Sequence, residues 1–412
     1  MACDALRVAI FTHDTFGLGH VRRCLHITRA LTARAPDSSV LLVTGSPALA
    51  MFAELPAHAD VVKIPTIAKT GAKGMRPPHV RIPLPELVAL RQRLIREALL
   101  GFAPDVFLVD NFPLGSQGEL APILQELRRV PTRTVLGLRD ILDAPDAVRA
   151  DWERQGVYDV LDRYYDRILV YGMREVLDIG SAYALSPGVA AKVRYCGYVT
   201  DDYSPPPDRD AIRAELGLPE RFLLATGGGG GDAFPLLKAF LDALPLLPEY
   251  PAIVVTGPLM NGSQRATLQT LLNGRTGVQL LASVPSLRPY LATAGAVVSM
   301  CGYNTVAEIV SLGASAVVVP RTWRYGEHLK GRAAGEEAEQ LMRGQALASL
   351  GLVDLVMPEE LTPERLAEGI RARVSQGRRT EPPPVDLGGL AAVADHLLEI
   401  ARARREGIHV AA

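Results

Sequence analysis

The chain contains 412 residues, which is enough for two or three hydrophobic cores rather than one. Its hydrophobic content of 48% excludes an intrinsically disordered protein. The 44 Lys and Arg residues are balanced by 45 Asp and Glu residues, so no overall basic excess points to a nucleic-acid-binding protein.

Cysteine usage and the length of the apolar runs limit the compartment. The four cysteines are far apart in sequence and form no CxxC pair: Cys3, Cys24, Cys196 and Cys301. This distribution excludes zinc ribbons and disulfide scaffolds and favours a reducing compartment. The apolar run after Asp4 is too short for a secretory signal, and no run approaches the roughly 18 apolar residues of a membrane span. We therefore expect a cytoplasmic α/β protein.

Short apolar runs rich in β-branched residues alternate with longer charged stretches in the first half of the chain. The runs are LRVAIFTHD, SVLLVTG, ADVVKIP, PDVFLVD, TRTVLGLRD, DRILVYG and KVRYCGYV. This alternation predicts βαβ units and a parallel sheet that is buried on both faces. We expect a Rossmann-like N-terminal domain over residues 1–200, followed by a proline-rich linker over residues 201–212.

The same alternation restarts after the linker, in the runs RFLLATGGGGG, AIVVTGP, VQLLASV, GAVVSMCG, SAVVVPR and VDLVMP. It predicts a second doubly wound domain over residues 213–380. Apolar residues then recur at helical spacing (Leu390, Val393, Leu397 and Ile400), which predicts a helix within residues 386–412 that packs back on the N-terminal domain. A ligand would lie at the carboxyl ends of the two sheets, in a central cleft between the domains.

A glycine-rich turn follows the first strand of each expected domain. Gly17 and Gly19 precede a helix, but Arg22 stands where the dinucleotide fingerprint has its third glycine, so a turn for tight packing is an equal alternative. Thr226 is followed by five glycines, Gly227–Gly231, whose backbone amides could surround a diphosphate. The alternative is a loose loop. No Walker lysine follows, which disfavours P-loop hydrolysis of ATP or GTP.

Three polar residues are expected at the carboxyl edge of the first sheet. His20 lies near the start of the first helix and could accept a proton from a hydroxyl, and Asp110 ends a strand and could orient the His20 ring. Arg139 ends another strand. The alternative for each of the three is a rim residue satisfied by backbone amides.

The segment VVSMCGYNTVAEIV predicts a strand, a turn at Gly302 and a helix. Asn304 and Thr305 lie at the helix start, where they could cap the helix or contact a phosphate. Glu308 lies one turn further and could bind the two hydroxyls of a ribose, although a solvated helix glutamate is the commoner alternative.

These motifs together resemble those of GT-B glycosyltransferases. The segment VVSMCGYNTVAEIV is similar to the plant UDP-glycosyltransferase donor motif, HCGWNS followed by Glu, and to the same region of MurG-like transferases. FGLGHVRRCLHITRAL is similar to the MurG-type glycine loop and its following His, and TGGGGG stands where that family has its second glycine loop. The resemblance covers most of the chain, whose best likeness is a group of bacterial predicted glycosyltransferases.

The resemblance implies roles for individual residues. His20 would be the acceptor-side base with Asp110 as its partner, and Arg139 would contact the acceptor. The residues that would bind the donor are Gly17, Gly19, Thr226, Gly227, Gly228, Gly229, Gly230, Val284, Gly302, Asn304, Thr305, Glu308, Glu339 and Gln340. Among them Glu308 would bind the ribose, Asn304 and Thr305 the diphosphate, and Val284 the base.

Two departures from the family pattern concern the donor site. Met300 stands where the plant motif has a phosphate-binding His, which MurG-type sequences also lack. The acidic-amide pair that contacts the donor sugar has two candidates, Glu327 with His328 and Glu339 with Gln340. The second pair matches better downstream and is preferred.

The resemblance implies transfer of a sugar from a nucleotide diphosphate sugar, UDP-linked by expectation, to a hydroxyl acceptor with inversion. It implies no metal and no cofactor, because glycine loops and helix termini would stabilise the departing diphosphate. Two alternatives stay open. One is a nucleotide-sugar epimerase or hydrolase on the same fold, and the other is a non-catalytic sugar-nucleotide-binding partner of another transferase.

A local basic stretch lies between Lys63 and Arg96, with eight basic residues against Glu86 alone: Lys63, Lys69, Lys73, Arg76, Arg81, Arg91, Arg93 and Arg96. It could contact an anionic lipid surface or a phosphorylated acceptor. A solvated loop and helix face is the commoner explanation of such a stretch.

Overall fold

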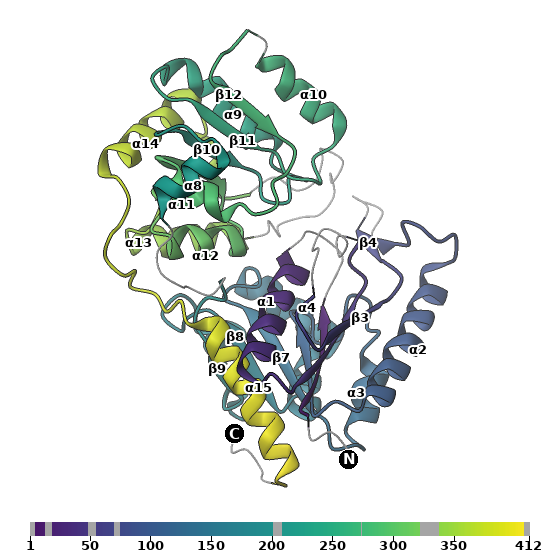
Figure 1. Cartoon of the computed structure of the whole chain (residues 1–412). Coiled ribbons are helices and arrows are strands. Elements are labelled where there is room, and N and C mark those ends of the chain that lie inside the picture. Colours follow the sequence, from purple (N-terminus) through teal and green to yellow (C-terminus); the bar gives the residue numbers. More distant parts are fainter. Residues whose placement is uncertain are drawn as a thin grey trace. The chain divides into compact units, whose positions relative to one another are not determined.

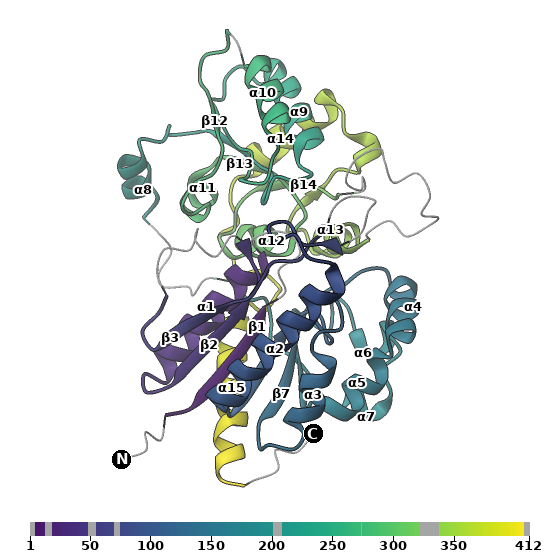
Figure 2. The same ribbon diagram turned by 90° about the vertical axis from the view of Figure 1, so that its right-hand side faces the viewer.

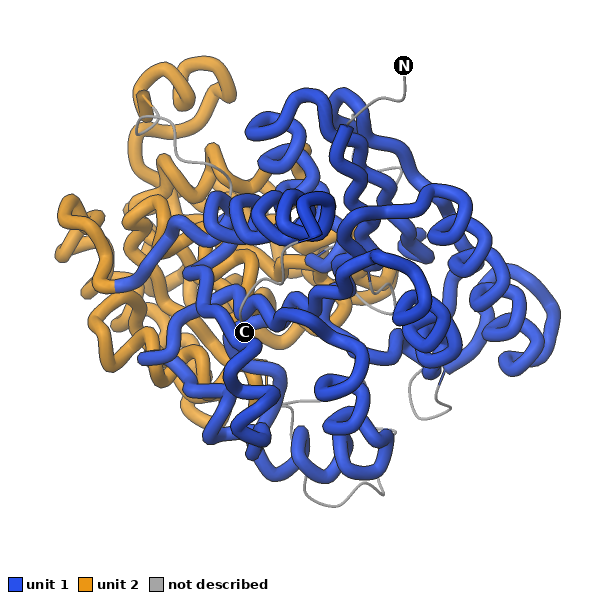
Figure 3. Tube along the Cα trace, turned by 90° about the horizontal axis from the view of Figure 1, so that it is seen from below, with its two compact units in different colours: residues 1–201, 385–412 blue, residues 202–384 orange. Residues whose placement is uncertain are grey.

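The computed structural model describes residues 5–12, 19–47, 55–69, 75–200, 208–272, 274–321 and 338–407. The chain divides into two compact units (Figure 3). Unit 1 comprises residues 1–201 and 385–412, and unit 2 comprises residues 202–384. Unit 2 is therefore inserted, in sequence, between the two parts of unit 1.

Unit 1 contains a seven-stranded parallel sheet in the order β3-β2-β1-β6-β7-β8-β9. The strands are β1 (Arg7–Thr12), β2 (Ser39–Thr44), β3 (Ala59–Lys63), β6 (Val106–Asp110), β7 (Arg133–Arg139), β8 (Arg167–Tyr171) and β9 (Val193–Tyr195). Each of the seven predicted runs forms one of them. The sequence missed a small antiparallel pair, β4 (Ala68–Lys69) with β5 (Met75–Arg76), because strands of two residues carry no periodic pattern.

Helices cover both faces of the unit 1 sheet (Figures 1 and 2). The helix α1 packs on β1 and β2, and its residues Val21, Leu25, Thr28 and Leu31, which lie on one helix face, are all buried. The helices are α1 (Gly19–Arg34), α2 (Leu84–Phe102), α3 (Ala121–Leu127), α4 (Pro145–Gln155), α5 (Val157–Tyr164), α6 (Ile179–Ala182), α7 (Pro187–Ala190) and α15 (Gly389–Arg405).

The last helix, α15, belongs to unit 1. It contacts α1, β1, β6 and β7, and its apolar residues Leu390, Val393, Leu397 and Ile400 are buried. Near its end Arg404 Nη1 and Arg405 Nη2 each lie 2.7 Å from the carboxylate of Asp105, whose side chain is 3% exposed. A helix distant in sequence therefore covers part of the N-terminal sheet.

Unit 2 contains a six-stranded parallel sheet in the order β12-β11-β10-β13-β14-β15. The strands are β10 (Leu223–Thr226), β11 (Ala252–Val255), β12 (Val278–Leu281), β13 (Ala296–Met300), β14 (Ala316–Val319) and β15 (Asp354–Leu355). All six predicted runs are strands, so the expected second doubly wound sheet is confirmed.

The helices of unit 2 are α8 (Arg209–Leu216), α9 (Phe234–Ala243), α10 (Gly262–Leu271), α11 (Arg288–Thr293), α12 (Tyr303–Ser311), α13 (Glu339–Ser349) and α14 (Pro363–Gln376), with 3-10 turns at Leu244–Leu246 and Pro358–Glu360. Helix α8 begins inside the segment expected to be a linker. Its start is set by Asp208, whose carboxylate accepts hydrogen bonds from the amides of Asp210 and Ala211. No helix in the described ranges is long and apolar enough to cross a membrane.

Both sheets reverse their winding direction at one point. In unit 1 the chain moves outward from β1 to β3 and then returns to β6 beside β1. In unit 2 it moves from β10 to β12 and returns to β13 beside β10. Doubly wound sheets bind ligands at the carboxyl ends of the strands that flank such a switch point. The loops after β1, β6, β10 and β13 are therefore the places where each unit can bind a ligand.

Candidate functional site

At the switch point of unit 1, His20 and Asp110 are in contact. His20 is the second residue of α1, just after β1, and Asp110 is the last residue of β6. His20 Nδ1 lies 2.6 Å from Asp110 Oδ2. The His20 side chain is 14% exposed and that of Asp110 is fully buried. The carboxylate is therefore protected from water, whereas the ring keeps a small exposed surface.

Arg23 is the third member of this cluster, and the sequence reasoning missed it. Its Nε lies 3.1 Å from Asp110 Oδ1, and its Nη2 lies 2.8 Å from Oδ1 and 2.9 Å from Oδ2. The Arg23 side chain is 2% exposed, and its guanidinium lies over the Tyr171 ring, 5.1 Å from the centroid. The available signal was a charged residue three positions after His20, on a helix face that is otherwise apolar.

Burial and the charged neighbours together shift the pKa values of Asp110 and His20. Burial raises the pKa of Asp110, but Arg23 and His20 outweigh it and lower that pKa from 3.8 to about 2. Burial lowers the pKa of His20 below 6.5, against the effect of Asp110, and Arg23 and Arg139 lower it further. Asp110 is therefore ionised and His20 neutral at pH 7.

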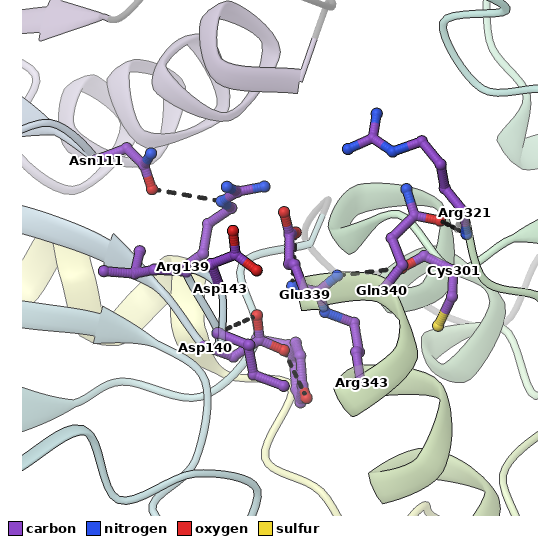
Figure 4. Close-up of polar contacts among 12 residues, drawn as sticks. Asn111, Arg139, Asp140, Asp143, Cys301, Arg321, Glu339, Gln340 and Arg343 are labelled. Carbon is purple, nitrogen blue, oxygen red and sulfur yellow. Dashed lines mark hydrogen bonds and ion pairs between the residues drawn. The ribbon is translucent and has the colours of Figure 1, made fainter. Parts of the chain in front are cut away.

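Arg139 lies at the end of β7 and is half-buried. Its Nε donates a hydrogen bond to Asn111 Oδ1 at 3.3 Å (Figure 4). Asn111 follows Asp110 with a φ of 68°, and its amide donates to the carbonyl of Gly137 at 2.7 Å. The neighbouring Asp140 is buried and accepts hydrogen bonds from the Ile141 amide and the Tyr198 hydroxyl. Arg139 is thus held at the same edge of the sheet as Asp110.

Of the first glycine turn, Gly19 is the first residue of α1, and Gly17 lies outside the described residues. The second turn is described in full. The loop after β10 packs against the loop after β11 so closely that a Cβ on Gly230 would lie 2.3 Å from the Thr256 carbonyl oxygen. A Cβ on Gly227 would lie 2.7 Å from the same oxygen. The five-glycine loop is therefore packed rather than loose, and close packing explains two of its glycines without a ligand.

The N-terminus of α12 lies beside this loop. A Cβ on Gly228, whose φ is 57°, would lie 3.8 Å from Thr305 Oγ1. Gly302 is the N-cap and offers no side chain to the first-turn amides of α12. Asn304 and Thr305 are half-buried in that first turn. Glycine amides and a helix N-terminus side by side form a site that favours an anion such as phosphate.

Glu308 is 5% exposed and lies one turn further along α12. A solvated helix glutamate, the commoner alternative from the sequence, is therefore wrong for this residue. Val284 is half-buried in the loop after β12. Thr226 ends β10, and its hydroxyl accepts a hydrogen bond from the Gly228 amide at 3.3 Å. Most of the residues expected to bind the donor thus follow the carboxyl ends of β10, β12 and β13.

The preferred acidic-amide pair lies at the start of α13 and has protein partners (Figure 4). Glu339 Oε1 lies 2.9 Å from Arg343 Nη2, and Gln340 Oε1 accepts a hydrogen bond from the Arg321 amide at 2.9 Å. Arg343 is fully buried and also donates to the Cys301 carbonyl at 3.0 Å. These contacts hold the first turn of α13 against the loops after β13 and β14.

The other pair, Glu327 with His328, lies outside the described residues. Within the described ranges no group of three or more His, Cys, Asp or Glu side chains is placed to hold a metal ion.

The basic stretch in unit 1 is smaller than the sequence suggested. Arg91 is fully buried. Its guanidinium lies 2.8 Å from the Glu119 carboxylate and donates a hydrogen bond to the Pro65 carbonyl, so it is not part of an exposed basic surface. The ammonium of Lys63 donates to the carbonyls of Gly45 and Ile64. Among the described members, Lys63, Arg76, Arg81 and Arg93 are exposed. A basic surface over residues 63–96 therefore rests on fewer cations than the eight counted.

No protein-family model matches the chain. The chain is 26% identical over 171 residues to the UDP-N-acetylglucosamine–N-acetylmuramyl-(pentapeptide) pyrophosphoryl-undecaprenol N-acetylglucosamine transferase of Exiguobacterium sp.. That match covers 41% of this chain and 44% of the relative, so the chain spans less than half of its length. The lipid-A-disaccharide synthase of Pseudomonas aeruginosa is 28% identical over 321 residues, which cover 74% of this chain and 73% of that one.

Solved structures match both units at once. MurG of Acinetobacter baumannii has a TM-score of 0.56 at 15% identity, covering 96% of this chain and 99% of that one. The chain has the GT-B fold of these glycosyltransferases. A UDP-glucosyltransferase of Polygonum tinctorium shares the GT-B fold with a TM-score of 0.61 at 13% identity, covering 98% of this chain and 100% of that one. The classification and the fold implied by the sequence motifs are thereby confirmed.

Proposed function

We propose that the protein transfers a sugar from a nucleotide diphosphate sugar to a hydroxyl group of an acceptor. The observation that carries the proposal is the set of groups found at the switch point of each sheet. A neutral histidine backed by a carboxylate lies at one, and glycine amides beside a helix N-terminus lie at the other. A base and an anion site are what this transfer needs from the acceptor and donor sides respectively.

On the acceptor side, His20 is proposed as the general base. Its Nδ1 faces Asp110, and Nε2 is proposed as the atom that accepts the proton of the acceptor hydroxyl. Asp110 then stabilises the imidazolium that forms. Arg139 is proposed to contact the acceptor, since it lies at the same edge of the unit 1 sheet.

On the donor side, the amides of Gly228–Gly230 and the first turn of α12, with Asn304 and Thr305, are proposed to bind the diphosphate. Glu308 is proposed to accept hydrogen bonds from the ribose hydroxyls. The acceptor oxygen attacks the anomeric carbon from the face opposite the diphosphate, and the bond between that carbon and the diphosphate breaks. The configuration inverts, and the amides rather than a metal ion take up the charge on the leaving group.

The donor base and the acceptor class rest on the relatives. The name of the Exiguobacterium relative specifies UDP-N-acetylglucosamine and an undecaprenol-linked acceptor. We extend the UDP moiety to this chain and leave the acceptor as a lipid-linked or small molecule with a free hydroxyl. A peripheral membrane contact through residues 63–96 would accompany a lipid-linked acceptor.

The test begins with binding. Thermal unfolding of the full chain is measured with UDP, GDP, dTDP and ADP, for the wild type, Glu308→Gln and Glu368→Gln. Glu368 is an exposed glutamate on α14 and serves as the matched control. A nucleotide at a hundred times its Kd stabilises by about 2.7 kcal/mol, or roughly 5–10 °C. We expect this shift with UDP in the wild type and control and a smaller shift in Glu308→Gln. No shift with any nucleotide would contradict the proposal.

Turnover then separates the alternatives. His20→Gln should lower transfer from a UDP-sugar by about 10²–10⁴-fold while the UDP-induced shift stays unchanged. A new sugar isomer formed without an acceptor would support an epimerase instead. Nucleotide binding without turnover, under any of the acceptors screened, would support a non-catalytic partner.

A further inference from the structure

We propose that Arg23 is a positioning residue, which holds the Asp110 carboxylate in the orientation that fixes the His20 ring with its proton on Nδ1. Its significance for catalysis rests on the proposed function, whereas the contacts on which it is based do not. No part of the family resemblance assigns a role to this arginine.

Arg23 fixes Asp110 through a fork of donors. Three contacts of 2.8–3.1 Å join its Nε and Nη2 to the two carboxylate oxygens. The guanidinium is itself held over the Tyr171 ring. Tyr171 in turn has no room to move toward β7, because its hydroxyl fills the place where a side chain of Gly137 would begin, 1.8 Å from the Cβ position. A buried, two-point contact of this kind allows one carboxylate orientation.

The contacts also determine the tautomer of His20. Asp110 is ionised, so both of its oxygens only accept hydrogen bonds. The contact of 2.6 Å between Oδ2 and Nδ1 is therefore a hydrogen bond only when Nδ1 carries the proton. Arg23 Nη2 lies 3.0 Å from the same Nδ1 and is also a donor. The cation therefore faces an N–H group rather than a lone pair, which opposes any further positive charge on the ring.

The charged groups that face His20 come from three elements. Asp110 at the end of β6 favours the protonated ring, whereas Arg23 on α1 and Arg139 at the end of β7 disfavour it. Arg23 partly neutralises the charge of Asp110 at close range, so the His20 ring lies beside an ion pair rather than beside an isolated carboxylate. The neutral base then persists to a lower pH than it would beside Asp110 alone.

The test measures the ring directly and needs no substrate. The imidazole ¹⁵N shifts of the full chain are titrated by NMR in the wild type, Arg23→Gln and Arg29→Gln, with the His20 signal assigned from its loss in His20→Gln. Arg29 is exposed on the same helix and controls for the loss of one positive charge. We expect the pKa of His20 to rise by at least about half a unit in Arg23→Gln and to stay within that margin in Arg29→Gln. A smaller rise in folded Arg23→Gln would overturn the proposal.

A second variant covers the case in which Arg23→Gln does not fold. Arg23→Lys keeps the positive charge but loses the rigid planar fork in which Nε and Nη2 contact the carboxylate. We expect the shifts of neutral His20 to lose the dominance of the Nδ1-protonated form, and unchanged shifts would overturn the positioning role. If UDP binding fails while these NMR results hold, the proposed function fails and the role of Arg23 in the cluster stands.

Discussion

The five-glycine loop of unit 2 allows structural and ligand-binding roles to be separated residue by residue. In Gly230→Ala, the new Cβ would lie 2.3 Å from the Thr256 carbonyl oxygen, at a φ of 91°. The left-handed conformation costs about 1–2 kcal/mol for a non-glycine residue, and relieving the overlap costs about 1–3 kcal/mol. Lower entropy of the unfolded chain returns about 0.5 kcal/mol. The net loss of unfolding free energy is about 2–4 kcal/mol.

The matched control is Gly229→Ala in the same loop. Its Cβ would meet no atom closer than Leu259 Cδ1 at 3.5 Å, which is ordinary van der Waals contact. Differential scanning calorimetry of the full chain should show the transition of unit 2 lowered by roughly 4–16 °C in Gly230→Ala and nearly unchanged in Gly229→Ala. Equal transitions for the two variants would refute the packing argument.

Gly228→Ala tests the ligand-binding role of the same loop. Its Cβ would project toward Thr305 at the N-terminus of α12, where the proposed diphosphate would bind. UDP affinity should fall at least about tenfold, which corresponds to about 1.4 kcal/mol. Wild-type affinity in this variant would place the diphosphate elsewhere.

Three further perturbations have directions fixed by the structure. The pKa of Asp110 is lowered to about 2 in the folded chain, so its ionised form stabilises the fold above pH about 4, and this stabilisation disappears as the pH falls through 2. In urea titrations, the free energy of unfolding of the wild type should therefore fall by about 2 kcal/mol more between pH 4 and 2 than that of Asp110→Asn. Arg343→Met should cost unit 2 about 3–5 kcal/mol, because it removes the buried cation that contacts Glu339 and the Cys301 carbonyl. Arg365→Met, at an exposed pair, should cost under about 1 kcal/mol in the same calorimetric assay. Deleting residues 385–412 should make unit 1 sensitive to limited proteolysis while unit 2 stays resistant, since α15 covers α1 and the unit 1 sheet; equal sensitivity of both units would contradict that division.

The strands of both sheets were predictable because buried parallel strands leave a continuous apolar run, as in VFLVD and AVVSM. The meeting of His20 and Asp110 was predictable for a related reason, since both follow strand ends at one sheet edge. Arg23 was missed in spite of its spacing from His20, because an arginine on a helix is ordinarily solvated and the burial of this one depends on Tyr171, far along the chain. Arg91 was misassigned to a basic surface for the same reason: its partner Glu119 is 28 residues away.

The glycine run shows a different limit of sequence reasoning. Five glycines in a row indicated a ligand, but the close approach of the loop at Thr256 accounts for Gly227 and Gly230 on packing grounds. Composition alone cannot divide a run of identical residues between two causes. Only the direction of each missing Cβ separates them.

The return of α15 to the N-terminal sheet has a consequence for biosynthesis. A ribosome releases the chain from its N-terminus, so β1, β6 and β7 emerge long before Leu390, Val393 and Leu397, which cover them. Throughout the synthesis of residues 202–384, the nascent first unit lacks its last helix and exposes apolar surface that the finished protein buries. Unit 2 is continuous in sequence and can complete its own fold first. The order in which the two units can be completed is therefore the reverse of the order in which they begin to be translated.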